Sequence, residues 1–183
     1  NINEIRFLNS LAPTPGPASA ARFDFDGDGS SDRVIYRNGT WWYAASGSGD
    51  AQYALVFGSA GDKLVAADYD GDGKTDPAVY RNGTWFGLGS TAGLIQLQFG
   101  LATDIPQPGD YDGDGKADFA VFRPSDGVWY MQRTTAGFGA IQFGISSDTP
   151  VSADFDGDGK TDQAVYRNGT WFVMGSTAGF YGV

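Results

Sequence analysis

The sequence of 183 residues contains no cysteine, no histidine and only one glutamate. Without cysteine, disulfides, thiolate metal ligands and cysteine nucleophiles are excluded. Without histidine, the usual general base and the usual zinc ligand are missing too. No stretch approaches the roughly 18 apolar residues of a membrane-spanning helix, so we expect no membrane insertion. No signal peptide is visible, so the signal of a secreted form would already be absent from this numbering.

The residues that are abundant are glycine, the aromatics and aspartate. The chain has 28 Gly, 13 Phe, 9 Tyr and 5 Trp, a composition that favours short strands joined by tight turns over helices. Its net charge of −10 argues against nucleic acid and anionic membrane surfaces as partners, because both are themselves negative.

One nine-residue pattern, Asp-x-Asp-Gly-Asp-Gly-x-x-Asp, occurs four times. It begins at residues 24, 68, 110 and 154, with spacings of 44, 42 and 44 residues, and its copies hold 16 of the 22 acidic residues. Four carboxylates within nine residues repel one another strongly unless a cation neutralises them. Four divalent ions would change the net charge from −10 to −2. The pattern therefore predicts metal-binding loops in preference to a solvated acidic surface.

The spacing within each loop favours calcium, at about four ions per chain. Carboxylates at positions one, three and five can turn toward a common centre, and glycine at position six permits the sharp turn. The backbone carbonyl of residue seven and the carboxylate at position nine complete an all-oxygen shell, which suits Ca²⁺ better than Mg²⁺ or a soft metal. Lysine at position seven of three loops fits a carbonyl ligand whose side chain points to water. The candidate ligands are Asp24, Asp26, Asp28, Ser30 and Asp32; Asp68, Asp70, Asp72, Lys74 and Asp76; Asp110, Asp112, Asp114, Lys116 and Asp118; and Asp154, Asp156, Asp158, Lys160 and Asp162.

The segments around the loops indicate strands. No glutamate stands at position twelve and no helical pattern flanks the loops, so an EF-hand is not expected. In the second repeat we predict strands at 64–68, 77–81, 84–88 and 94–99, with Asn82-Gly83 as a type I′ hairpin turn. Four antiparallel strands in 42 to 44 residues match the size of a propeller blade.

We therefore predict an all-β fold, a β-propeller-type array of four four-stranded antiparallel blades. The blades fall at about 20–63, 64–105, 106–149 and 150–183, and residues 1–19 form an N-terminal strand and a Pro-rich linker. Tryptophan recurs at the start of each third strand, and we favour packing between blades over stacking on sugars. Arginine recurs after each second strand and suggests an ion pair between blades. These residues are Trp41, Trp85, Trp129 and Trp171, and Arg37, Arg81, Arg123 and Arg167.

The sequence resembles the FG-GAP/VCBS repeat family, which occurs in integrin α-subunit propellers, fungal lectins and many secreted bacterial proteins. The matching features are the Asp loops, the Ala-Val-Tyr-Arg strand and the Phe-Gly pairs at 57–58, 99–100 and 143–144, over about residues 20–183. The resemblance implies a propeller with Ca²⁺ between the first two strands of each blade. Family propellers commonly have seven blades, whereas this chain supplies four. A closed four-bladed ring, a portion of a larger one, and pairing of Ile5–Phe7 with the last blade or with another copy all remain open.

Three classes of function compete. The first is a non-catalytic extracellular module that binds glycans or a surface protein, with Ca²⁺ stiffening the scaffold. The alternative is a structural, self-assembling extracellular repeat protein that uses strand exchange. A polysaccharide-active enzyme is weakest, because the loops commit 16 carboxylates to metal and histidine is absent. Calcium-rich surroundings keep such sites filled, so we expect the protein outside the cell.

Overall fold

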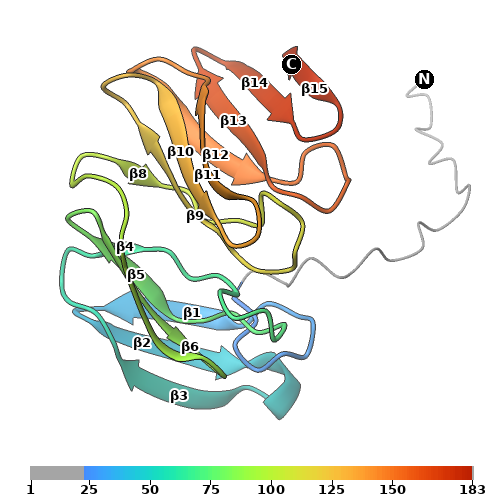
Figure 1. Cartoon of the computed structure of the whole chain (residues 1–183). Helices are drawn as coiled ribbons and strands as arrows, with labels where there is room; N and C mark the ends of the chain where they lie inside the picture. Colours follow the sequence, from blue (N-terminus) through green and yellow to red (C-terminus); the bar gives the residue numbers. More distant parts are fainter. Residues whose placement is uncertain (1–22, 183) are drawn as a thin grey trace, which may run out of the picture.

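The structure is a computed structural model that describes residues 23–182, and it is a four-bladed β-propeller (Figure 1). The predicted all-β fold is confirmed: the described part contains one short 3₁₀ turn, η1 (Ser46–Ser48), and no α-helix. The predicted N-terminal strand and linker, residues 1–19, lie outside the described residues.

Each blade is an antiparallel sheet whose strands follow one another in chain order. The first blade contains β1 (Arg33–Arg37), β2 (Thr40–Ala45) and β3 (Ala51–Val56). The second contains β4 (Lys63–Leu64), β5 (Ala78–Arg81), β6 (Thr84–Gly89) and β7 (Gly93–Gln98). The third contains β8 (Ile105–Pro106), β9 (Phe119–Arg123), β10 (Val128–Arg133) and β11 (Gly137–Gln142). The fourth contains β12 (Thr149–Ala153), β13 (Asp162–Arg167), β14 (Thr170–Gly175) and β15 (Gly179–Gly182).

Two details differ from the predicted four-stranded blades. The first sheet has three strands within the described residues, which begin at Phe23. The strand predicted at 64–68 is reduced to β4, followed by a single bridge between Ala67 and Asp76. The interruption lies where the chain enters the acidic loop. There the Asp76 carboxylate accepts a hydrogen bond from the Tyr69 N–H of the loop.

The Asn-Gly hairpin turns within the blades have the predicted type I′ geometry. Asn82 and Gly83 have φ values of 49° and 85°, which a type I′ turn requires at both central positions. The turns at 38–39 and 168–169 share this geometry. The third blade has a longer turn, which closes with the Gly127 N–H donating to the Arg123 carbonyl at 2.8 Å.

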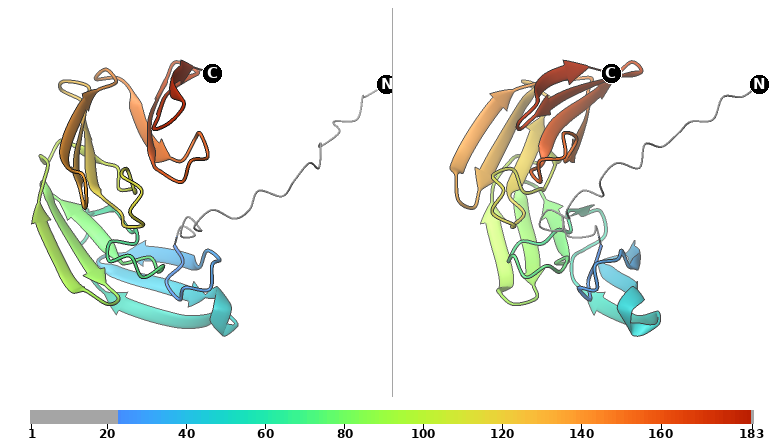
Figure 2. Two further views of the ribbon diagram at one scale, coloured as in Figure 1. Left: turned by 45° about the vertical axis from the view of Figure 1, so that its right-hand side comes forward. Right: turned by 90° about the vertical axis from the view of Figure 1, so that its right-hand side faces the viewer.

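The blades follow one another around a common centre in chain order (Figure 2). One backbone hydrogen bond of 2.6 Å joins the acidic loops of each successive pair. The donors and acceptors are Thr75 and Asp24, Ala117 and Asp68, and Thr161 and Asp110. No corresponding bond joins the fourth blade to the first within residues 23–182.

The recurring tryptophans form the core of the first three blades. Trp41, Trp85 and Trp129 are at most 1% exposed, and each indole N–H donates to the carbonyl of the Phe in a Phe-Gly pair at 2.8 to 2.9 Å. The edge of the Trp85 ring meets Phe119 of the next blade, with 5.4 Å between centroids. Packing between blades thus explains these residues. Trp171, in the fourth blade, is 37% exposed.

The recurring arginines form ion pairs, but not between two sheets. Arg81, Arg123 and Arg167 contact Asp62, Asp104 and Asp148 at 2.6, 2.9 and 2.5 Å. Each Asp directly precedes the first strand of the same blade, so the pair anchors the connection between blades to the sheet that follows. The guanidinium hydrogen bond lowers the pKa of Asp62 and of Asp148. The predicted ion pair between blades thus takes the form of a link from each sheet to the connection that arrives from the preceding blade.

The buried and exposed tryptophans provide a matched test of blade packing. We expect Trp85→Ala to lower the free energy of unfolding by about 3–5 kcal/mol, because it empties a packed site and removes a hydrogen bond. Trp171→Ala stands at the same repeat position but is partly exposed, so its effect should be less than half as large. Urea unfolding followed by circular dichroism measures both, and equal losses would contradict the assigned core.

Candidate metal centres

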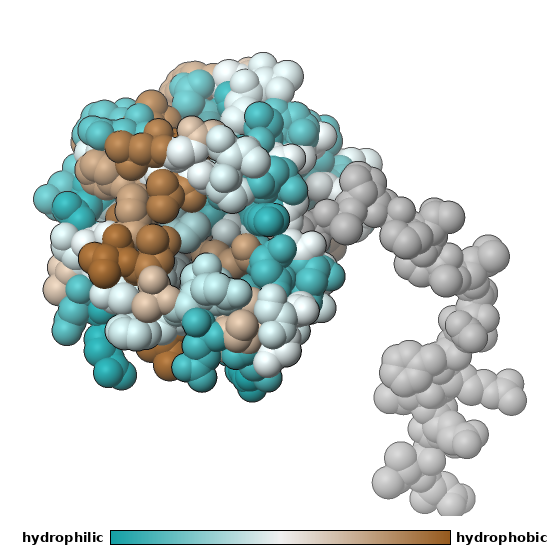
Figure 3. All heavy atoms as spheres, turned by 90° about the horizontal axis from the view of Figure 1, so that it is seen from below, coloured by the Kyte–Doolittle hydropathy of each residue, from teal (hydrophilic) through white to brown (hydrophobic). Residues whose placement is uncertain are grey.

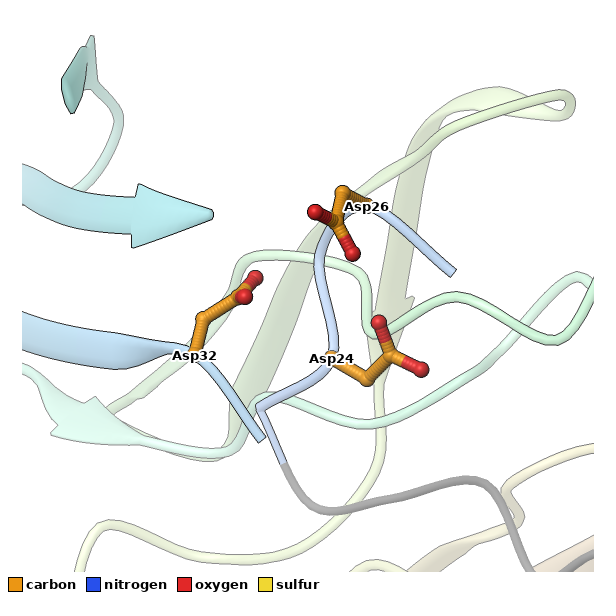
Figure 4. Close-up of side chains that lie close together, drawn as sticks. All are labelled: Asp24, Asp26 and Asp32. Atoms are coloured by element: carbon orange, nitrogen blue, oxygen red, sulfur yellow. The ribbon is translucent and has the colours of Figure 1, made fainter. Parts of the chain in front are cut away.

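Each acidic loop brings three carboxylates together. The residues at positions one, three and nine offer oxygen atoms that all lie within 4.8 Å of one another. In the first blade this trio gathers where the loop meets the start of β1 (Figure 4). The four trios are Asp24, Asp26 and Asp32; Asp68, Asp70 and Asp76; Asp110, Asp112 and Asp118; and Asp154, Asp156 and Asp162.

The first aspartate of each loop organises the backbone around it. In the second blade, Asp68 Oδ1 accepts from the Gly71 N–H at 2.7 Å, and Oδ2 accepts from the Gly73 N–H at 2.8 Å. Both glycines have positive φ, 79° and 87°, which side-chain-bearing residues adopt at a cost. The repeated Gly-x-Gly spacing thus lets the loop curl around one carboxylate.

The ninth residue ties the loop to two other segments. Asp76 is fully buried, and its two oxygens accept from the backbone N–H of Tyr69 and of Ser90, each at 2.9 Å. Burial raises the pKa of Asp76 to about 6. Asp118 makes the equivalent bonds to Tyr111 and Thr134, and burial likewise raises its pKa to about 6. Burial therefore disfavours the ionised form of the ninth residue in these two loops.

The third residue provides the clearest test of whether the trios fit a cation. Asp70 Oδ2 accepts from the N–H of Thr91 and of Ala92 at 2.8 and 2.9 Å, whereas its Oδ1 is buried without a hydrogen-bond partner. Asp112 and Asp156 have the same unpartnered Oδ1. A buried carboxylate oxygen without a partner is unfavourable, and a hard cation satisfies it. The trios therefore fit an oxygen-ligated divalent ion.

The fifth residue lies outside the trios. Asp72, Asp114 and Asp158 instead accept from hydroxyl groups of the turn after the third strand, as Asp72 does from Ser90. Hydrogen bonds from Ser176 and Thr177 lower the pKa of Asp158 to about 2. Asp28 in the first blade likewise accepts from the Ser46 hydroxyl, at 2.9 Å. The structure thus gathers positions one, three and nine and places position five beside them.

The side chain of the seventh residue lies across a neighbouring loop in three of the four repeats. A Cβ added to Gly27 would lie 3.1 Å from both Cγ and Cε of Lys74, so this lysine lies across the loop of the preceding blade. Lys116 and Lys160 lie across Gly71 and Gly113 in the same way. These stems cover the neighbouring loop because its glycine at position four leaves room, and Lys116 is exposed while Lys74 and Lys160 are half-buried. The proposed carbonyl ligands at residues 30, 74, 116 and 160 stay predictions.

A second group of residues at these sites was missed. The turn after the third strand donates backbone N–H groups and hydroxyls to the loop carboxylates, and it recurs as Ser90–Ala92, Thr134–Ala136 and Ser176–Ala178. In the first blade, Ser46 and Gly47 take this role. The available signal was the repeated Thr-Ala-Gly at 91–93, 135–137 and 177–179.

A cavity of about 650 Å³ lies between the inner strands and the loops of the second, third and fourth blades. Small residues such as Ala67, Gly109 and Ala153 line it together with Asp68, Asp110 and Asp154. The first aspartate of three loops therefore borders a shared space, which places the candidate metal centres beside a possible ligand site.

Comparison with known proteins identifies the repeat. Residues 110–165, the third acidic loop to the fourth blade's β13, match the family model described as FG-GAP-like repeat. This match confirms the resemblance to FG-GAP repeats that the Asp loops and the Phe-Gly pairs indicated, over residues 110–165. No curated protein matches the chain significantly. Among the described residues, no helix is both long and apolar enough to cross a membrane.

The raised pKa values of the ninth residues predict how pH acts on calcium-free protein. Asp76 and Asp118 have folded pKa values near 6, above the ordinary 3.8 of the unfolded chain, so the folded state takes up protons first as pH falls. Between pH 7 and pH 5 the chelated protein should gain about 1 kcal/mol of stability from each residue.

Calcium should reverse this dependence, because protons compete with the ion for the same carboxylates. Melting temperatures at pH 5, 6 and 7, with chelator and with excess calcium, test both directions. A chelated protein that loses stability from pH 7 to pH 5 would contradict the assigned burial.

Proposed function

We propose that this FG-GAP-repeat protein is a non-catalytic, extracellular, calcium-binding propeller that acts as a binding or adhesion module. The observation that carries the calcium assignment is the buried, unpartnered Oδ1 of Asp70, Asp112 and Asp156 within three of the four carboxylate trios. FG-GAP repeats are typically calcium-binding and usually extracellular, which supports both the metal and the location.

Calcium would act here on the scaffold. Positions one, three and nine supply the ligands, and the bound ion neutralises carboxylates that otherwise repel. The carboxylates of Asp70 and Asp76 also accept hydrogen bonds from the turn at Ser90–Ala92, so fixing them holds the loop, the second strand and the third-strand turn together. The loop also bonds the next blade through Asp68 O and Ala117 N, so a filled site stiffens the contact between blades.

The acidic residues outside the loops support a non-catalytic role. Asp62, Asp104 and Asp148 are bound to arginines, Asp50 pairs with Arg33, and Asp126 accepts from the Tyr130 hydroxyl. A hydrolase needs a poised acid and base with free access to substrate. All acidic residues in the described part outside the loops thus have structural partners.

A glycan or a cell-surface protein is the partner class that we propose. Trp41, Trp85 and Trp129 are buried and cannot serve as sugar platforms, which leaves the central cavity and the exposed apolar surface. Seen from the side on which the first two blades lie, the molecule carries a band of apolar residues between hydrophilic ones (Figure 3). Such bands mark interaction sites on soluble proteins. The net charge of −10 disfavours nucleic acid.

The metal assignment has a stoichiometric test. Calorimetric titration of chelated protein should give about four calcium ions per chain, one for each trio. Asp70→Asn removes one charged ligand and should abolish or weaken one site by about tenfold or more, leaving the others filled. Asp126→Asn removes the same charge outside the loops and should leave four sites. Absence of calcium binding by the unaltered chain would refute the assignment.

The binding role requires a direct search for ligands. The calcium-loaded chain should bind a subset of an immobilised glycan panel or intact cell surfaces, and chelation or Asp70→Asn should weaken that binding. If neither surface retains the loaded protein above a control protein of similar charge, the adhesion role fails while the calcium assignment stands.

The strand exchange of the self-assembling alternative involves Ile5–Phe7, which lie outside the described residues.

A further inference from the structure

We propose that the four candidate metal centres are not equivalent, and that the centre of the first blade is a weaker, exchangeable calcium site beside three tighter ones. This inference rests on the proposed calcium binding and adds how the four sites differ in affinity. It is carried by the turn that donates hydrogen bonds to the loop carboxylates from the strand hairpin beside each loop, called here the support turn.

The support turn of the first blade has a different length and sequence from the other three. It lies between the paired residues Ala45 and Ala51, contains η1, and reads Ser-Gly-Ser-Gly-Asp over residues 46–50. In the other blades the support turn reads Ser-Thr-Ala or Thr-Thr-Ala, over residues 90–92, 134–136 and 176–178. The difference lies in the first blade's own sequence and does not depend on its neighbours.

In the second, third and fourth blades the support turn fixes the third loop residue. Asp70 Oδ2 accepts from the Thr91 N–H, the Thr91 hydroxyl and the Ala92 N–H at 2.8, 2.9 and 2.9 Å. Oδ2 of Asp112 and of Asp156 each accepts two backbone N–H groups, at 3.0 and 2.8 Å. In all three residues Oδ1 is buried without a hydrogen-bond partner. One oxygen is thus held by the turn while the other stays available to a cation.

The first blade holds its third loop residue less firmly. Asp26 Oδ2 accepts from the Gly47 N–H at 3.0 Å, and glycine has no hydroxyl to add. Asp26 Oδ1 accepts from the Asp28 N–H at 3.2 Å, so the oxygen that is unpartnered in the other loops is engaged here by the loop backbone. A cation therefore finds this carboxylate less firmly oriented and its Oδ1 already shared.

These differences predict a lower affinity in the first blade. A carboxylate that is already held in its binding orientation loses less conformational freedom when the ion arrives. Groups that orient a metal ligand are important for this reason, and losing one typically weakens metal binding by about 10- to 100-fold. We therefore expect the first site to bind Ca²⁺ at least about tenfold more weakly than the other three.

Charge acts in the opposite direction. The first loop has Ser30 at position seven, where the other loops have Lys74, Lys116 and Lys160, so the first loop is more negative. Within residues 23–182, however, the ion pairs with carboxylates all involve arginine and none involves these lysines. Solvent and salt screen charges that are not in contact. Orientation of the ligands therefore outweighs this difference in charge.

The contact between the first and second blades does not require Asp26. The Thr75 N–H donates to the Asp24 carbonyl at 2.6 Å, and the Asp24 N–H donates to the Thr75 hydroxyl at 3.0 Å. The support turn of the first blade, by contrast, meets the loop through the carboxylates of Asp26, Asp28 and Asp32. Filling the first site thus orders residues 46–50, while the contact between blades persists in either state.

Calorimetric titration of the chelated chain with calcium should resolve three tight ions and one ion that binds at least about tenfold more weakly. Asp26→Asn should remove the weak phase and leave three tight ions. Asp70→Asn, its match in the second blade, should remove one tight ion and keep the weak phase. Four ions of equal affinity, or loss of a tight ion in Asp26→Asn, would overturn the inference and leave the calcium assignment intact, whereas absence of binding would refute both.

Exchange of the support turns tests the cause of the difference. Replacing residues 46–50 by Ser-Thr-Ala should tighten the first site until four ions bind alike, and replacing residues 90–92 by Ser-Gly-Ser-Gly-Asp should give two weak ions. The whole turn is exchanged because a Cβ on Gly47 alone would lie 2.8 Å from Cβ of Asp28. Circular dichroism checks that each variant is folded. If both folded variants titrate like the unaltered chain, the support turn does not set the affinity and the inference fails.

Hydrogen exchange measured by mass spectrometry gives a readout that does not depend on fitting the titration. At a calcium concentration that fills the three tight sites, amides of residues 46–50 should exchange faster than they do at saturating calcium. Amides of residues 90–92 should show the same protection at both concentrations. Full protection of residues 46–50 before the last ion binds would overturn the inference, because the first site would then not be the weak one.

Discussion

The mutual repulsion of the four aspartates in each nine-residue loop is the constraint on which the rest of the structure depends. Their repulsion is relieved by directing each carboxylate at a different donor: the loop backbone for position one, hydroxyls for position five, and two separate segments for position nine. These bonds connect the first three strands of a blade through one small polar centre. The remaining oxygen at position three is buried without a donor in three blades, which leaves a place for a cation.

The same loops also control how the blades pack. The second, third and fourth loops each donate a backbone hydrogen bond to the preceding loop, and in each of these three a lysine stem lies over the glycine of that neighbour. Glycine at position four therefore serves two purposes, a positive φ within its own loop and room for the next blade's lysine. The candidate metal ligands and the contact between blades are consequently linked through the same loops.

Sequence periodicity predicted most of what depends on local chemistry. The Asn-Gly turns and the four strands of the later blades follow from residue types at fixed offsets. The predicted shell also included position five, whereas the structure gathers positions one, three and nine. The errors concern partners distant in sequence. Asp72 bonds Ser90, and Lys74 meets Gly27, because strand pairing and blade stacking bring these segments together. Arg123 pairs with Asp104 on a connecting turn, which no repeat-internal pattern assigns to one blade or the other.

The exposure of a side chain depends on the position of its blade in the array as much as on its residue type. Trp129 and Trp171 occupy the same place in their repeats, yet one is fully buried and the other is 37% exposed, because only Trp129 has a following blade. In a repeat protein each unit is stabilised mainly by its neighbours, so the exposure at one repeat position depends on the blades that lie beside it. Within the described residues, Tyr166, Trp171, Ile35 and Trp42 lie on faces without such a neighbour and are 37% to 59% exposed.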